Sequence, residues 1–216
     1  MMPSMSLEIP EPERGSEPVA EPEAPARRVL DDPMVLRAFA HPLRLTLHRL
    51  LIREGTCSAA YAARETGISQ ALASHHLHQL EKYGFAEQLV GRDRRERPWR
   101  ALSRSTTWLG ADTTPRGAVA ADLLEQTLAE QAVSHLLGWQ QRRRDPEQAD
   151  WHDVAGLDTS LLYLTSAEAD DFGKAFEALC APYIHRRNEP GSRAAERSPV
   201  EITLLLVPLP PTASGS

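Results

Sequence analysis

The sequence predicts a mainly α-helical chain of the α+β class. Three observations carry this prediction. Apolar residues recur at helical spacing over much of residues 33–82 and 117–144, strand-like segments flank a charged loop near residue 91, and two more strand-like segments lie toward the C-terminus. With 216 residues, 41% of them hydrophobic, the chain is long enough for one domain or two small ones.

Residues 1–31 predict a disordered tail. This segment contains six prolines, repeated Glu-Pro dipeptides and few large apolar side chains. It cannot bury enough apolar surface to offset the loss of chain entropy on ordering. Order is expected to begin near Asp32 and Pro33, because an N-cap residue followed by proline is a helix start signal.

Four helices are predicted between residues 33 and 82. The first ends before Pro42, and the second runs from Pro42 to about Glu54. The third covers residues 58–65, and the fourth, capped by Ser69, runs to about Lys82. A glycine follows each of the last three helices, as is common where helices end: Gly55, Gly67 and Gly84.

The helical period then gives way to a basic hairpin. Residues 85–90 and 97–102 predict two short strands around a charged loop over 91–96. The order of helix, helix, short turn, helix and hairpin is typical of a winged helix-turn-helix domain, here over residues 32–105. Its hairpin arginines, with His78, are expected to contact the phosphate backbone of DNA. These arginines are Arg92, Arg94, Arg95 and Arg97.

The fourth helix has two different faces. At 100° per residue, one face gathers the predicted core positions Leu72, Ala73, His76, Leu77 and Leu80, and His76 is expected to form hydrogen bonds inside the protein. The other face carries short or polar side chains that fit a major groove about 12 Å wide. The predicted base-reading residues on it are Gln70, Ala71, Ser74 and His75. The alternative interpretation of this face is an ordinary solvated surface.

The net charge of −6 conceals a basic block. Residues 1–32 carry −5, residues 33–104 carry +6 and residues 105–216 carry −7. A basic block between acidic segments is typical of a module that binds a polyanion such as double-stranded DNA. The alternative is composition bias, since 22 of the 24 basic residues are arginine.

Residues 106–145 predict a linker and a long dimerisation helix, the helix covering about residues 117–144. One apolar stripe along it needs a partner surface. The stripe consists of Val119, Leu123, Leu124, Leu128, Ala132, Leu136 and Trp139. The predicted dimer contacts within it are Leu124, Leu128, Ala132, Leu136 and Trp139.

Residues 151–210 predict a strand-helix-strand unit for dimerisation or for an effector. Its strands are expected at 157–164 and 200–207, around a helix at about 166–181 that begins with a capping box of Thr165 and Glu168. The predicted buried face of the helix is Phe172, Phe176 and Leu179. Two strands and one helix are too few to stand alone, so the unit must pack on the long helix or on a second subunit.

Four segments carry a family resemblance. AFAHPLR at 38–44, GISQ at 67–70, SHHLHQLE at 74–81 and GF at 84–85 resemble the ArsR-type winged-helix transcriptional regulators, and the C-terminal unit resembles longer actinobacterial members. The resemblance implies a homodimer with two recognition helices in successive major grooves of an inverted-repeat operator, usually as a repressor. It also implies base-facing positions at Gln70, Ala71, Ser74 and His75.

No metal or cofactor is expected. The Cys-x-Cys pair of metal-sensing members would fall on Ser58 and Ala60, and a second pattern on the long helix keeps only Asp122 and His135 of its ligands. Cys57 and Cys180 fit neither a disulfide framework nor a zinc ribbon.

The predicted function is therefore a sequence-specific DNA-binding transcriptional regulator, open to an unidentified small-molecule effector. The alternative is a winged-helix module for protein interaction without DNA binding. The sequence contains no GxSxG, HExxH or phosphate-binding glycine loop, so no enzyme is expected. It has neither a leader-like start nor an apolar stretch of about 20 residues, which predicts a cytoplasmic protein without a membrane partner.

Overall fold

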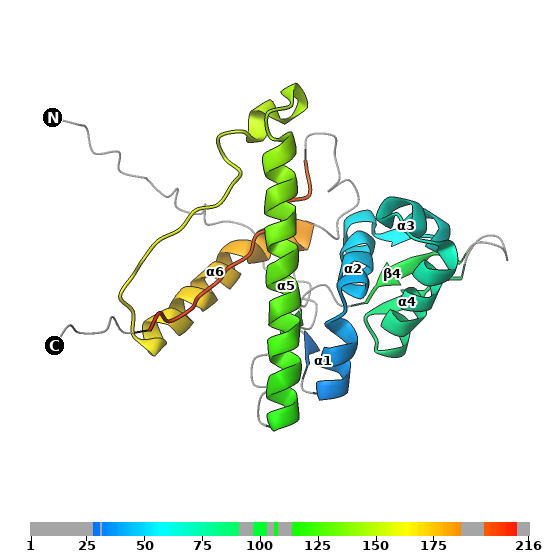
Figure 1. The fold of residues 1–216 in the computed structure, drawn as a ribbon, viewed down its shortest axis with the longest axis horizontal. Helices are drawn as coiled ribbons and strands as arrows, with labels where there is room; N and C mark the ends of the chain where they lie inside the picture. The colour runs from blue at the N-terminus through cyan, green and yellow to red at the C-terminus, as the bar shows by residue number, and fades with distance from the viewer. Residues whose placement is uncertain are drawn as a thin grey trace, which may run out of the picture.

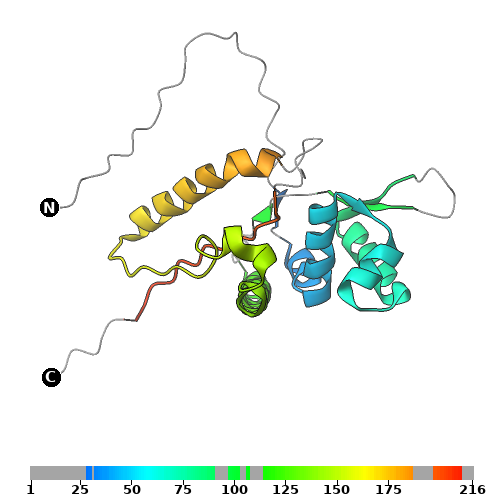
Figure 2. The same cartoon turned by 90° about the horizontal axis from the view of Figure 1, so that it is seen from above.

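The computed structural model describes residues 28–30, 32–90, 97–102, 106–107, 114–186 and 197–210. It shows a compact helical domain, a long helix beside it and a further helix on the other side of the long one (Figures 1 and 2). The helices are α1 (Pro33–Phe39), α2 (Pro42–Glu54), α3 (Ala59–Thr66), α4 (Gln70–Lys82), α5 (Pro115–Arg142), the 3-10 helix η2 (Pro146–Trp151) and α6 (Ser166–Arg186).

The predicted helix starts of the winged domain are confirmed by side-chain caps. The Met34 amide donates to Asp32 Oδ1 at 2.8 Å, and Ser58 Oγ and Ser69 Oγ each accept an amide hydrogen bond at 3.2 Å in the first turns of α3 and α4. Each cap satisfies a backbone N–H that has no partner within its helix. Gly67 ends α3, as the sequence predicted, and adopts the left-handed conformation with φ of +69°.

Three short strands form an antiparallel sheet in the order β2-β4-β3. They are β2 (Thr56–Cys57), β3 (Ala86–Gln88) and β4 (Trp99–Ala101), and Glu87 and Thr56 both pair with Arg100 in the central strand. The predicted hairpin strands are therefore confirmed. The sequence did not predict β2, because a strand of two residues shows no alternation.

Residues 28–30, which the sequence assigned to the disordered tail, belong to the folded part of the chain. β1 (Arg28–Val29) pairs in parallel with β5 (Thr106–Thr107), and the Leu30 side chain is buried in the core. The predicted boundary of the disordered tail at residue 31 is wrong for these three residues. A single buried leucine after a proline-rich segment gives no periodic signal, which is why composition alone misplaced the boundary.

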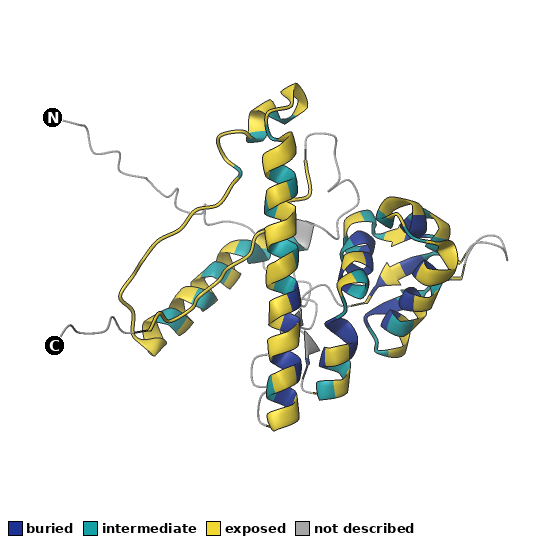
Figure 3. Ribbon diagram, viewed as in Figure 1, coloured by how far each residue is buried: buried dark blue, intermediate teal, exposed yellow. Residues whose placement is uncertain are grey.

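The core of the winged domain lies between α1, α2, α4 and the sheet. Phe39 of α1 stacks on Phe85 at 4.0 Å between ring centroids, and Trp99 of β4 is buried beside them. Leu124 of α5 is also fully buried in this cluster. The winged domain and the first half of α5 therefore share one core (Figure 3).

The predicted stripe on α5 is divided between two environments. Leu124 lies inside the core of its own chain, where it cannot contact a second subunit, so the predicted role of this residue in dimerisation is wrong. Leu128 packs half-buried against the same core, whereas Val119 and Leu123 are exposed. The cause is that α5 lies on α1, and this contact selects the face with Ala120 and Leu124.

The second half of α5 is less covered. Ala132, Leu136 and Trp139 are half-buried, and Trp139 Nε1 donates to the Ala155 carbonyl at 3.1 Å. This hydrogen bond folds the chain after η2 back onto the end of α5. Among the described helices, none is both long and apolar enough to cross a membrane.

The C-terminal unit differs from its prediction. The capping box is confirmed, since the Thr165 amide donates to Glu168 Oε2 at 2.7 Å and the Glu168 amide donates to Thr165 Oγ1 at 3.2 Å. Residues 157–164 and 200–207 are not strands, because neither segment has a neighbouring strand among the residues that the structure describes. In the single chain the predicted buried face of α6 is largely uncovered, since Phe172 and Leu179 are exposed and Phe176 is half-buried.

Candidate nucleic-acid interface

Helices α3 and α4 and the turn between them form the helix-turn-helix. The Ile68 amide donates to the Ala63 carbonyl at 3.0 Å, and Gly67 supplies the positive φ that the tight turn requires. Ser69 then caps α4. These local interactions set the angle at which α4 leaves the turn and hold it on the sheet side of α3 (Figure 1).

One face of α4 is buried as the sequence predicted. Ala73, Leu77 and Leu80 are almost fully buried, and His76 is buried among them. Leu72, predicted with this face, is instead 41% exposed. Viewed down the helix axis, the mean direction of these four buried side chains lies about 90° from the direction of Leu72. Leu72 therefore lies at the margin of the buried face.

The opposite face of α4 is open. Gln70, Ala71 and His75 are exposed, and Ser74 is half-buried. Within the described part of the chain, no segment lies over this face (Figure 3). The structure therefore brings the four predicted base-reading residues together on one accessible side of a well-anchored helix.

His78 lies at the boundary between α4 and the sheet. Its Nδ1 is 3.1 Å from Glu81 Oε2, and its ring packs edge-on against Trp99 at 4.9 Å between centroids. These contacts orient the imidazole and link α4 to β4, the central strand of the sheet. The His78 side chain is still 55% exposed to solvent.

The structure describes one of the four predicted hairpin arginines. Arg97 is exposed just before β4, whereas Arg92, Arg94 and Arg95 lie outside the described residues. Arg100, exposed in the middle of β4, donates from Nε to Glu87 Oε1 at 2.9 Å, so its charge is already neutralised by the neighbouring strand.

Two further basic residues near α4 were missed. Arg64 of α3, with 70% of its side chain exposed, stacks at 4.9 Å over the ring of Tyr61, and Lys82 is exposed in the last turn of α4. Helical spacing could have placed Arg64 on the outer side of α3. Arg64 Nε lies 3.5 Å from Glu65 Oε1, which partly offsets its charge, whereas Lys82 adds positive charge at the end of α4.

His76 does not form the predicted hydrogen bonds. Its Nδ1 is buried and has no hydrogen-bond partner among the described residues. The centroid of the His76 ring lies 4.7 Å from that of His41 and 5.2 Å from that of His75. Burial lowers the pKa of His76, and the nearby His41, Arg44 and His75 lower it further. Burial and Arg44 also lower the pKa of His41.

These histidines predict a loss of stability in acid. Because their pKa values in the folded protein lie below the ordinary 6.5, the unfolded chain binds more protons once the pH falls below about 6.5. The free energy of unfolding is therefore expected to be fully developed above that pH and to decrease as the pH falls below it. Urea denaturation between pH 7.5 and 5, followed by circular dichroism, measures this slope.

A matched pair of variants tests whether His76 causes this pH dependence of the free energy of unfolding. His76→Gln is expected to flatten the pH dependence, because it removes the buried titrating group. The same change at the exposed His152 is expected to leave the dependence as in the wild type. An unchanged slope in His76→Gln would contradict the assignment to this buried group.

The described residues do not assemble a metal centre. No group of three or more His, Cys, Asp or Glu side chains in this part of the chain is arranged to hold a metal ion. His135 instead pairs with Glu201. Burial raises the pKa of the Cys57 thiol to about 11, which keeps it protonated at neutral pH and makes it a poor ligand.

Comparison with known proteins places a domain family on the same region. Residues 39–88 match the family model of a helix-turn-helix domain, from the end of α1 to the end of β3. No curated protein matches the chain. A solved structure of ZitR from Lactococcus lactis, a double mutant in its apo form, aligns with 18% sequence identity over 67% of this chain and 86% of that one, with a TM-score of 0.27.

Proposed function

From this helix-turn-helix, we propose that the protein is a transcriptional regulator that binds double-stranded DNA through α4 and the β3–β4 hairpin. The observation that carries the proposal is the open face of α4, where small and polar side chains lie on a helix whose other face is fully anchored. A helix of this kind can enter the major groove without large side chains obstructing its approach.

The side chains suggest distinct roles in that groove. The Gln70 amide can form two hydrogen bonds with an adenine, and the Ala71 methyl can contact the methyl group of a thymine. Ser74 and His75 supply further donors or acceptors to base edges. Arg97 and the hairpin arginines supply charge for phosphates or for a narrow minor groove, which positions the protein without selecting a sequence.

We further propose that the protein is a homodimer that binds an inverted-repeat operator and represses transcription. Exposed apolar residues on α5 recur at alternating steps of four and three, at Val119, Leu123, Val133 and Leu137, with the polar pair Gln126 and Glu130 between them. This heptad spacing favours pairing with a second α5. A two-fold dimer would place two α4 helices on half-sites about 10 bp apart.

Binding to a pool of random duplex DNA tests the proposal directly. Purified protein is expected to retain duplexes, with affinity falling steeply as salt is raised, because each neutralised phosphate contributes a slope of about −0.9 in log K against log salt. Sequencing the retained fragments gives the operator. Absence of any salt-sensitive binding across the pool would refute DNA binding.

A pair of alanine variants separates base reading from backbone contact. Gln70→Ala is expected to reduce discrimination at one base pair of each half-site by about 1–3 kcal/mol, with binding to scrambled DNA nearly unchanged. Arg97→Ala is expected to weaken binding to all duplexes alike and to reduce the salt slope by about 1. Fluorescence anisotropy on operator and scrambled duplexes measures both effects, and equal behaviour of the two variants would contradict the assigned roles.

A further inference from the structure

The C-terminal unit exposes an unusual amount of apolar surface. Sixteen large apolar side chains between Val154 and Leu209 are exposed, and they lie in both extended segments as well as on α6. Figure 3 shows the contrast with the winged domain, whose buried residues are concentrated in one core. Monomeric proteins seldom leave so many large apolar side chains of one unit in water.

The two extended segments also lack the partners that a strand requires. In the described part of the chain, no backbone hydrogen bond joins residues 157–164 or 200–207 to another segment. Residues 200–207 (VEITLLLV) are rich in β-branched side chains and lie between Pro199 and Pro208, which limit a strand to this length. The segment therefore has the composition and extended shape of a strand without a neighbour.

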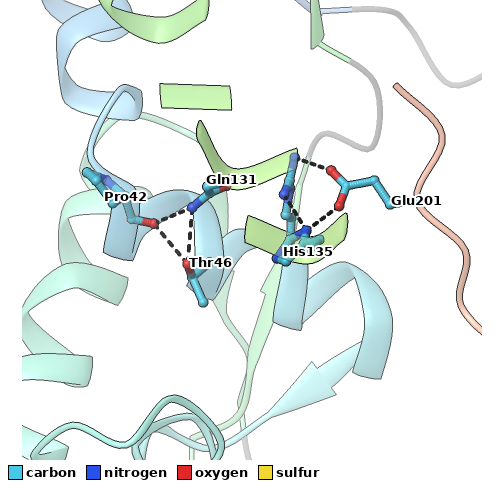
Figure 4. Close-up of polar contacts among 6 residues, drawn as sticks. Pro42, Thr46, Gln131, His135 and Glu201 are labelled. Carbon is cyan, nitrogen blue, oxygen red and sulfur yellow. Dashed lines mark hydrogen bonds and ion pairs between the residues drawn. The ribbon is translucent and has the colours of Figure 1, made fainter. Parts of the chain in front are cut away.

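A polar anchor fixes where this segment lies. Glu201 forms an ion pair with Arg49 of α2 at 2.6 Å and a hydrogen bond with His135 of α5, and Arg49 Nη1 also lies 3.4 Å from His135 Nδ1 (Figure 4). Successive side chains of an extended chain point to opposite sides. Because Glu201 points to the junction of α2 and α5, Val200 and Ile202 point away from it.

We propose that the C-terminal unit is an interface for a second copy of this chain, in which residues 200–207 pair as a β-strand with the partner's C-terminal unit. The two copies would together form a sheet that neither forms alone. Such an arrangement satisfies the unpaired backbone groups of both copies and covers the exposed apolar side chains of α6.

The available area is sufficient for a stable dimer. Burying one aliphatic side chain of this size removes roughly 60–120 Å² from water. Sixteen side chains that are on average about 60% exposed therefore offer roughly 600–1,200 Å² in total, compared with about 800 Å² per partner in a typical stable interface.

The charge of the segments favours a second copy over a differently charged partner. Residues 157–164 contain one charged side chain, Asp158, and residues 200–207 contain one, Glu201, which is already paired. Two identical surfaces of this kind meet without repulsion between like charges. The inference rests on the proposed function in one respect, because two-fold recognition of an operator also requires a dimer.

Two leucines with similar exposure provide a matched test. Leu206 in the segment is 45% exposed and Leu102 after β4 is 49% exposed. Leu206→Lys is expected to raise the dimer dissociation constant of the full chain by at least about tenfold, whereas Leu102→Lys leaves it unchanged. Sedimentation velocity over a range of concentrations measures both constants in the absence of DNA. Equal constants for the two variants would overturn the proposal.

Hydrogen exchange gives a second, independent measurement. In the wild-type dimer, the amides of residues 200–207 are expected to be protected, and Thr203→Pro, which removes a backbone donor in the middle of the segment, is expected to abolish this protection. Free exchange of these amides in a wild-type dimer would refute strand pairing. Protection that persists in a monomer would show pairing within one chain and would refute it equally.

The outcome is separable from that of the proposed function. If Leu206→Lys dissociates the dimer but the wild type retains no duplex DNA, the interface stands and DNA binding fails. If the wild type binds duplex DNA with the expected salt dependence while residues 200–207 exchange freely in the dimer, DNA binding stands and the interface proposal fails.

Discussion

Replacing Leu124 with alanine is expected to lower the free energy of unfolding by about 2–5 kcal/mol, because the side chain is 0% exposed in the core that α5 shares with the winged domain. A loss of this size is a large fraction of the stability of an ordinary domain. Urea denaturation of the full chain at fixed concentration measures it.

Leu123, the preceding residue, is the control. It is 40% exposed and belongs to the proposed α5 seam, so Leu123→Ala is expected to change stability chiefly through dimerisation. The shift in the denaturation midpoint should therefore depend on protein concentration for Leu123→Ala and be constant for Leu124→Ala. A concentration-dependent shift for Leu124→Ala would place that side chain at a dimer contact, contrary to the structure.

Replacing Trp99 with alanine is expected to cost about 3–5 kcal/mol of stability, because Trp99 is a fully buried aromatic residue in the central strand of the sheet. The change also removes the ring against which His78 packs, so the hairpin loses its fixed orientation to α4. Binding to operator and scrambled DNA is expected to weaken together in protein that remains folded.

Trp99→Phe separates packing from hairpin orientation. Phenylalanine retains an aromatic ring for His78 and much of the buried volume, so most of the stability and DNA affinity should return. Thermal unfolding and anisotropy on the same preparations give both quantities. If Trp99→Ala matched the wild type in stability, the core position of this residue would be wrong.

The sequence predicted the winged domain well because its signals are local. Asp32 and Ser69 cap the helices that they were expected to cap, Ser58 caps the helix that was expected to begin with it, and Gly67 ends α3. These features depend on a few neighbouring residues, so they can be predicted without knowledge of the tertiary fold.

Features that depend on distant partners could not be predicted in this way. β2 is defined by its pairing with β4, and the burial of Leu124 depends on how α5 lies against α1. Residues 200–207 illustrate the reverse case, since a strand-forming sequence forms no strand without a neighbour. In the candidate interface, exposure of Gln70, Ala71 and His75 was predictable from helical periodicity, whereas the ion pair of His78 with Glu81 was one of several options for that side chain.

The attachment of α5 to the start of α2 would fix the distance between the two α4 helices of a dimer. Gln131 Nε2 donates to the Pro42 carbonyl at 2.9 Å and lies 3.2 Å from Thr46 Oγ1 (Figure 4). Thr127 Oγ1 donates to the Ala40 carbonyl at 3.3 Å. These bonds hold the long helix against the end of α1 and the start of α2. The paired long helices of a dimer would then hold the two DNA-binding domains at a fixed separation. Inserting half a turn of DNA between two half-sites would rotate one half-site out of reach of its α4.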